Sequence, residues 1–167
     1  MNSFDFTSYD CIGFDLDNTL AEYEEHELIN LIYNILANLM VSKHGYNQVH
    51  LLTPLKDDID FIRKGLTIDI ERGNIVSLAN DGSVLRASHG TRVLSIAEII
   101  QAYGPNRMWD VGVQHCNDFL TTWNGHLSEK IRSSLDYFDI CVPLLFARSI
   151  DSVVLSLIHI SEPTRPY

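Results

Sequence analysis

The sequence predicts an α/β fold, and three patterns in its 167 residues point to it. An apolar run over residues 9–14 ends abruptly in Asp15-Leu16-Asp17-Asn18-Thr19, which is typical of a short buried strand followed by a polar turn. Apolar residues at helical spacing fill residues 25–44. Short alternating runs between residues 65 and 90 indicate strands.

The predicted helix over residues 25–44 is the clearest element. Its apolar positions recur at intervals of three and four residues. They are Leu28, Leu31, Ile32, Ile35, Leu36, Leu39 and Met40. Lys43-His44-Gly45 is a suitable helix end, because glycine adopts the left-handed conformation that often stops a helix.

Residues 65–90 predict a three-stranded β-meander. Its strands are expected near residues 66–70, 75–78 and 84–87, and His89-Gly90 closes the unit. Glu71-Arg72-Gly73-Asn74 and Asn80-Asp81-Gly82-Ser83 separate the runs, and such sequences supply the left-handed conformations of tight hairpins.

Two further helices are expected downstream. Ser95 and Glu98 form a capping box that predicts a helix over residues 95–103, ended by Gly104-Pro105. The apolar residues of 137–154 predict a buried helix after a turn at Pro143. Residues 107–130 show no clear pattern.

Composition excludes several classes of function. The net charge of −10 argues against a nucleic-acid-binding surface, which needs a basic stripe. No run approaches ~20 apolar residues, so we expect no membrane span. Three cysteines without CxxC spacing indicate neither a disulfide framework nor a zinc site. Because the start also lacks a signal-peptide pattern, we expect a cytoplasmic protein.

The motif Asp15-Leu16-Asp17-Asn18-Thr19 has the chemistry of phosphoryl transfer. A carboxylate at a strand end can attack a phosphoryl group and form an aspartyl-phosphate. Mg²⁺ would offset the repulsion between the two anions, held by an Asp carboxylate and a backbone carbonyl two residues on. Asp17 can then serve as general acid and base.

The motif has two other interpretations. Asp, Asn and Thr are good helix caps, so residues 15–19 can be a plain turn before the next helix. An EF-hand calcium loop needs glycine at its sixth position and glutamate at its twelfth. Leu20 and His26 occupy these positions, which excludes that loop.

Residues 11–23, Cys-Ile-Gly-Phe-Asp-Leu-Asp-Asn-Thr-Leu-Ala-Glu-Tyr, resemble the first motif of the haloacid-dehalogenase superfamily. The form is closest to that of the cytosolic purine 5'-nucleotidase and the 5'-nucleotidase domain-containing proteins. The similarity continues in Lys64-Gly65-Leu66, in Glu71-Arg72-Gly73-Asn74, and through residues 80–91. A weaker similarity covers Tyr137-Phe138-Asp139 and residues 147–151.

The resemblance implies the N-terminal part of a Rossmann-like core, with a β-meander and helical cap elements and an incomplete core sheet. It implies Mg²⁺ and hydrolysis of a nucleoside 5'-monophosphate. Asp15 would be the nucleophile and a metal ligand. Asp17 would be the acid/base, and its carbonyl a metal ligand. Thr19 and Phe138 would bind substrate, although a core aromatic is an equal interpretation of Phe138.

Three superfamily motifs have no match here: the Ser or Thr of a second strand, a lysine and an acidic pair. Residues 1–154 are therefore expected to be one fragment of a domain, and inactive alone. Residues 155–167 resemble a translated sequencing adaptor and are expected to be a non-native tail, with an ordinary polar tail as the alternative.

Other residues and functions stay open. His89 and Arg86 are candidate substrate contacts, but a hydrogen-bonded turn histidine and an exposed strand arginine are the simpler interpretations. The adjacent His115 and Cys116 are discounted as metal ligands, because they cannot both face one metal without further ligands. A catalytically weak, nucleotide-binding or regulatory relative is the alternative to an enzyme.

Overall fold

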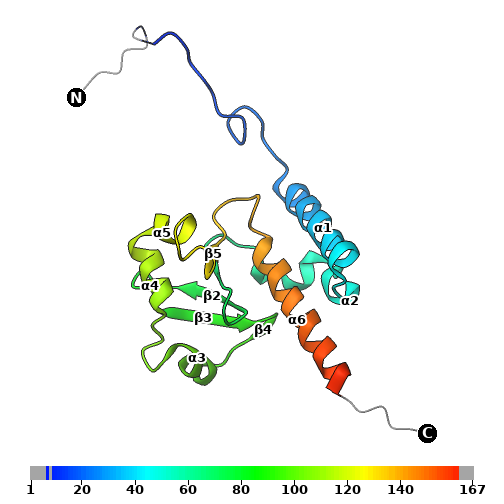
Figure 1. The fold of residues 1–167 in the computed structure, drawn as a ribbon. Helices are drawn as coiled ribbons and strands as arrows, with labels where there is room; N and C mark the ends of the chain where they lie inside the picture. The colour runs from blue at the N-terminus through cyan, green and yellow to red at the C-terminus, as the bar shows by residue number, and fades with distance from the viewer. Residues whose placement is uncertain (1–6, 8, 162–167) are drawn as a thin grey trace.

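A five-stranded antiparallel sheet forms the middle of the chain in the computed structural model, which describes residue 7 and residues 9–161, the last seven by backbone alone. The strand order is β4-β3-β2-β1-β5. The strands are β1 (Leu66–Asp69), β2 (Asn74–Leu78), β3 (Val84–His89), β4 (Arg92–Val93) and β5 (Ile131–Ser133). Helices cover both faces (Figure 1).

The predicted β-meander is confirmed, since β1, β2 and β3 pair as consecutive antiparallel strands. The turn between β2 and β3 depends on Gly82. Its φ of +83° is in the left-handed region, and a Cβ there would lie 2.5 Å from the Cα of Val113. Glycine is therefore required by both conformation and space. Two short strands, β4 and β5, extend the sheet beyond the prediction.

The two faces of the sheet bury different cores. Thr67, Val76 and Ala87 are in register on one face. Helix α3 (Ile96–Tyr103) packs there through Ile99 and Tyr103. Ile68 and Ile75 lie on the opposite face, which packs against Ala147 of helix α6 (Val142–Ser161). Alternation along each strand explains the division, because successive side chains point to opposite faces.

A helical layer lies beside the sheet. It contains α1 (Glu25–His44), α2 (Gln48–Leu51), the 3-10 segment η2 (Leu55–Phe61) and α6. The predicted helix over residues 25–44 is confirmed, and Gly45, with a φ of +70°, ends it. A core of Ile29, Tyr33, Ala37, Leu51, Ile140, Cys141 and Leu144 joins α1 and α2 to α6. Helix α6 thus contributes to two cores, on different sides.

Arg148 of α6 is the largest fully buried side chain, at 2% exposure. Its Nε and Nη2 donate to Oδ2 of Asp58 at 3.0 and 2.7 Å. Its Nη1 donates to the Tyr33 hydroxyl and the Thr53 carbonyl, and its Nη2 also to the Pro54 carbonyl. All five guanidinium N–H donors are thereby used. One side chain therefore ties α1, the turn after α2, and η2 to α6.

A hairpin of the sheet is also fastened to α6. The carboxylate of Asp151 accepts from the Thr91 backbone N–H at 3.1 Å and from the Thr91 hydroxyl at 2.7 Å. Gly90 precedes Thr91, and a Cβ on Gly90 would lie 1.8 Å from Oδ1 of Asp151. Only glycine lets the β3–β4 turn approach the helix this closely.

The predicted capping box is confirmed. Ser95 accepts from the Glu98 backbone N–H, and the Glu98 carboxylate accepts from the Ser95 backbone and hydroxyl. Two helices fall in the stretch without a sequence pattern, α4 (Asp110–Asn117) and α5 (Phe119–Trp123). They are short, and their amphipathic period spans too few turns to be recognised from sequence.

The predicted buried strand over residues 9–14 is not formed. Ile12 and Phe14 are 56% and 71% exposed, and the segment leads away from the folded body (Figure 1). A buried strand needs neighbours to satisfy its backbone, and every described strand pair belongs to the antiparallel sheet of residues 66–133. The structure therefore shows a mixed α/β fold, without the Rossmann-like core within the described residues.

Helix α6 differs from its prediction at both ends. It begins at Val142, so Pro143 lies inside the first turn, where no intrahelical N–H is needed. It continues through Ser161, into the segment predicted to be a non-native tail; residues 162–167 lie outside the described residues. The origin of residues 155–167 stays a prediction. None of the described helices is long and apolar enough to span a membrane.

The buried guanidinium makes a testable prediction. Arg148→Met should lower the free energy of unfolding by about 3–5 kcal/mol, because Asp58 and the Thr53 and Pro54 carbonyls lose their partner. Urea unfolding followed by circular dichroism measures the change. Arg92→Ala is the control, since it removes an ion pair whose side chains are 63% and 40% exposed. A similar loss in both variants would contradict the assignment.

The capping box predicts a pH effect. Hydrogen bonds from the Ser95 backbone and hydroxyl, and then from Arg92, lower the pKa of Glu98 from 4.5 to about 2. A lowered folded-state pKa stabilises the protein above pH 4.5, and this contribution is lost as pH falls toward 2. Thermal melts across that range should show a smaller loss of Tm for Glu98→Gln than for wild type. Glu129→Gln, at an exposed carboxylate, should follow the wild type.

Candidate functional site

Residues 16–21 form a tight turn just before α1. The Leu16 carbonyl accepts from the N–H groups of Leu20 and Ala21 at 3.0 and 2.9 Å, and the Asn18 N–H donates to the Ala21 carbonyl at 2.8 Å. Asn18 has a φ of +54°, a left-handed conformation that asparagine tolerates better than most residues. The predicted polar turn is thus present, and the sequence Asp-Leu-Asp-Asn-Thr folds it locally.

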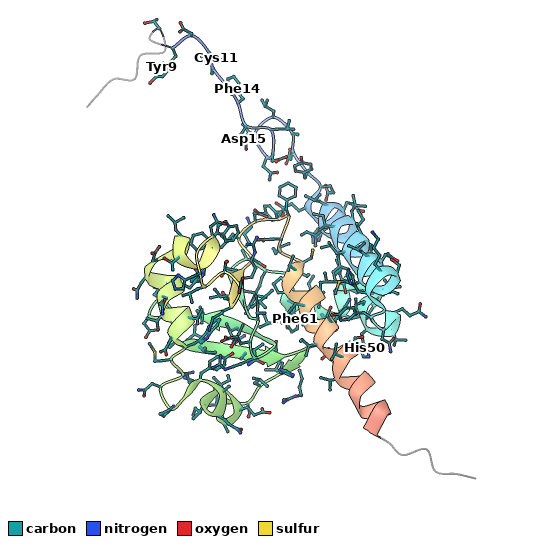
Figure 2. The ribbon with its side chains drawn as sticks, viewed as in Figure 1. Tyr9, Cys11, Phe14, Asp15, His50 and Phe61 are labelled. Atoms are coloured by element: carbon teal, nitrogen blue, oxygen red, sulfur yellow. The ribbon has the colours of Figure 1, made fainter. Side chains whose placement is uncertain are left out.

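The turn presents its polar side chains to solvent. Asp15, Asp17 and Thr19 are all exposed. Figure 2 labels Asp15 on the segment that leads away from the helices and sheet, at the entrance to the turn. The nucleophile candidate is therefore open to solvent rather than enclosed by the folded body.

Asp17 has a specific partner in Tyr23. The Tyr23 hydroxyl donates to Oδ1 of Asp17 at 2.5 Å. Donation to this carboxylate raises the pKa of Tyr23, because the phenol proton is held by the negative charge. One carboxylate oxygen of Asp17 is thereby held by Tyr23.

Tyr23 also reaches Phe138, far along the chain. Their ring centroids lie 6.0 Å apart, with the planes at 81°, a favourable edge-to-face arrangement. Phe138 is 44% exposed, so it is not a core aromatic residue. The structure thus brings two predicted site residues, Asp17 and Phe138, to either side of one tyrosine.

The loop that carries Phe138 is held rigidly before α6. Oδ1 of Asp136 accepts from the N–H groups of Phe138 and Asp139, at 2.8 and 3.2 Å. Oδ1 of Asp139 accepts in turn from the N–H groups of Leu135 and Asp136. Burial raises the pKa of Asp139. The two aspartates act on the loop backbone, which explains why Phe138 has a defined position.

The described residues include no group of three or more His, Cys, Asp or Glu side chains that could hold a metal. Asp15 and Asp17 supply carboxylate oxygens at the turn. Mg²⁺ is commonly bound by one or two carboxylates, with waters and substrate phosphate filling its other positions. The donor set of the turn therefore fits part of a magnesium shell.

Other candidates from the sequence have structural partners. His89 shares a hydrogen bond of 3.0 Å with Oδ1 of Asn74, as expected of a hydrogen-bonded turn histidine. Two charged residues outside this candidate set also have partners: Asp58 pairs with Arg148, and the Lys64 ammonium lies 3.7 Å from the Tyr137 ring centroid. Arg86 is exposed on β3.

Sequence reasoning missed Tyr23 as a site residue. The motif over residues 11–23 includes it, but no spacing rule links a tyrosine six residues beyond Asp17 to that carboxylate. The folded turn loops the chain between Asp17 and Ala21, which form an isolated parallel bridge, and this loop brings Tyr23 to Asp17.

Comparison with known proteins places the chain in context. A sequence model of the 5' nucleotidase family matches residues 1–156. The chain is 40% identical over 151 residues to 5'-nucleotidase domain-containing protein 1 of Bos taurus, and 40% identical over 149 residues to the protein of that name in Homo sapiens. These matches cover 90% and 89% of this chain.

The same matches cover 31% of each relative, so the chain spans about a third of the length of these relatives. The family match extends across the turn of Asp15 and Asp17, the meander and the loop of Phe138. It therefore includes every residue that the sequence marked as a site candidate. The chain belongs to the 5' nucleotidase family.

Proposed function

We propose that the full-length protein is a Mg²⁺-dependent phosphohydrolase that cleaves nucleoside 5'-monophosphates through an aspartyl-phosphate. The observation that carries this proposal is the exposed Asp15–Thr19 turn in a chain of the 5' nucleotidase family. The turn supplies a nucleophile and a proton donor two residues apart. Family membership supplies the class of substrate.

In the proposed reaction, a carboxylate oxygen of Asp15 attacks phosphorus, and the bond from phosphorus to the ribose 5'-oxygen breaks. Asp17 gives its proton to that oxygen as the nucleoside leaves. Water then attacks the aspartyl-phosphate, Asp17 takes a proton from it, and phosphate and free Asp15 result. The Tyr23 hydroxyl holds one oxygen of Asp17, so the other can face the leaving group.

The metal would be held by the Asp15 carboxylate and the Asp17 backbone carbonyl. When bound, Mg²⁺ neutralises negative charge shared by the nucleophile and the phosphate. Thr19, at the end of the motif, would bind the phosphate with its hydroxyl. Phe138 presents a half-exposed ring beside Tyr23, and such a ring suits stacking on a nucleobase.

A second function has one observation in its favour. Within the described residues, Asp15 and Asp17 lack a third metal-ligating side chain, and both are exposed to water. A site open to water stabilises the charge that develops in the transition state less than a site from which water is excluded. A nucleotide-binding or regulatory role with weak catalysis would need only the turn and the aromatic pair. For the same reason we propose that the 167-residue chain alone is inactive.

Removal of the nucleophile tests catalysis. Asp15→Asn in the full-length protein should lower Mg²⁺-dependent phosphate release from nucleoside 5'-monophosphates by at least ~10³-fold, since no other group forms the covalent intermediate. A phosphate-release assay with and without Mg²⁺ measures it. Asp10→Asn, an exposed carboxylate of the same segment, is the matched control. Equal release by Asp15→Asn and wild type would reject the proposal and favour the binding role.

Truncation of the aromatic side chain tests substrate contact. Phe138→Ala should raise KM about 10-fold or more and leave kcat within about twofold, because base–aromatic stacking contributes ~1–3 kcal/mol. Steady-state kinetics on the full-length protein provide both constants. Leu120→Ala, which removes an apolar side chain with 71% exposure, should change neither. A fall in kcat with constant KM would contradict a binding role for Phe138.

A further inference from the structure

His115 and Ser133 form a polar pair that the proposed phosphohydrolase does not use. His115 lies on α4 and Ser133 on β5, and Oγ of Ser133 is 2.8 Å from Nε2 of His115. The other ring nitrogen, Nδ1, is 2.5 Å from Oγ1 of Thr122. On the far side, the Thr67 hydroxyl is 3.1 Å from Oγ of Ser133.

The Thr122 hydroxyl determines which group donates and which accepts in each hydrogen bond of this network. The Thr122 hydroxyl donates its single proton to the Phe119 carbonyl, so it can only accept from His115. Nδ1 of His115 therefore carries the ring proton, and Nε2 of the neutral ring is an acceptor. Ser133 must donate to Nε2, and Thr67 must donate to Ser133.

His115 is in the correct protonation state for a base. Burial lowers its pKa, because an imidazolium is poorly solvated there. The neutral ring is therefore favoured near neutral pH, with its Nε2 lone pair directed at the Ser133 hydroxyl. A nucleophile, a base and a third group that orients the base are the parts of a hydrolytic serine site.

The pair lines a cavity. A pocket of about 380 Å³ is bounded by Gly65, Thr67, Leu78, Asn80, His115 and Ser133, among others. Its volume suits a small organic molecule. Leu78 offers an apolar wall, and the exposed amide of Asn80 can donate to a carbonyl oxygen.

The neighbouring Ser134 is a comparison for Ser133, because its hydroxyl has only a structural role. Ser134 is as buried as Ser133, at 2% exposure, and its hydroxyl donates to the Asp139 carbonyl at 3.1 Å. A carbonyl oxygen cannot take up a proton at neutral pH, whereas an imidazole can. The two adjacent serines therefore differ in chemistry although they match in burial.

We propose that Ser133 is an activated nucleophile, with His115 as its base, toward small acyl esters in this pocket. Oγ attacks the ester carbonyl carbon while its proton passes to Nε2 of His115. The bond from carbon to the alkoxy oxygen then breaks, and that oxygen takes the proton from Nε2. Water attacks the acyl carbon and gives a proton to Nε2 of His115. The bond from that carbon to Oγ breaks, His115 passes the proton to Oγ, and a carboxylic acid is released.

Labelling with a fluorophosphonate tests the proposal on the 167-residue chain. Oγ of Ser133 displaces fluoride from phosphorus, its proton passes to His115, and the adduct is located by peptide mass spectrometry. We expect one modified peptide, at Ser133, and no label in Ser133→Ala. Ser134→Ala should label at the wild-type rate. His115→Gln should label about 10²–10⁴-fold more slowly, the range of general-base catalysis.

Two further measurements make the result decisive. Asp15→Asn should label like the wild type, so the outcome is independent of the proposed phosphohydrolase. If Ser133→Ala does not fold, Ser133→Cys keeps the pair, and iodoacetamide should alkylate the new thiol faster than it does in Ser133→Cys combined with His115→Gln. No adduct at Ser133 in the folded chain, or equal rates with and without His115, would overturn the proposal.

Discussion

The fold depends on the satisfaction of one buried charge. A guanidinium removed from water costs several kcal/mol unless each of its N–H groups finds an acceptor. Arg148 meets this requirement with Tyr33 of α1, Asp58 of η2 and two backbone carbonyls of the turn after α2. The need of five N–H groups for acceptors therefore fixes where α1, the turn after α2 and η2 lie. Burial raises the pKa of Tyr33, while Arg148 opposes the rise, so the phenol stays protonated and can donate onward to Leu51.

Helix α6 connects these helical segments to the sheet. Leu144 faces the helical core, Ala147 faces the sheet, and Asp151 holds the β3–β4 turn. The far face of the sheet has its own polar anchor. The carboxylate of Asp69, fully buried, accepts from Arg72 and from the Tyr103 hydroxyl, and burial raises the pKa of Tyr103. Each layer is thus fixed to the next by a carboxylate or guanidinium, with apolar packing around it.

Local patterns predicted local structure well. The helix over residues 25–44, the capping box of α3 and the glycine turns of the meander each depend on residues close in sequence, and all three are confirmed. The buried residues of α1 are Ile29, Tyr33 and Ala37, whereas Leu31, Ile35 and Leu39 of the predicted apolar set are exposed. The strand predicted over residues 9–14 is not formed. An apolar run indicates that a segment can be buried, but it does not indicate that a neighbouring strand is present to pair with it. In the candidate site, the turn of Asp15 and Asp17 was predictable. The contact of Tyr23 with Phe138 and the pairing of His115 with Ser133 were not, because they depend on the tertiary course of the chain.

The segment before α1 has a consequence for the chain in a cell. Ile12, Phe14, Leu16 and Leu20 are each more than half exposed, and residues 11–15 belong to no helix or strand. Apolar side chains that are exposed together favour association with other apolar surfaces. The tendency of the chain to associate therefore depends on this segment beside the two aspartates, and not only on the stability of the folded body.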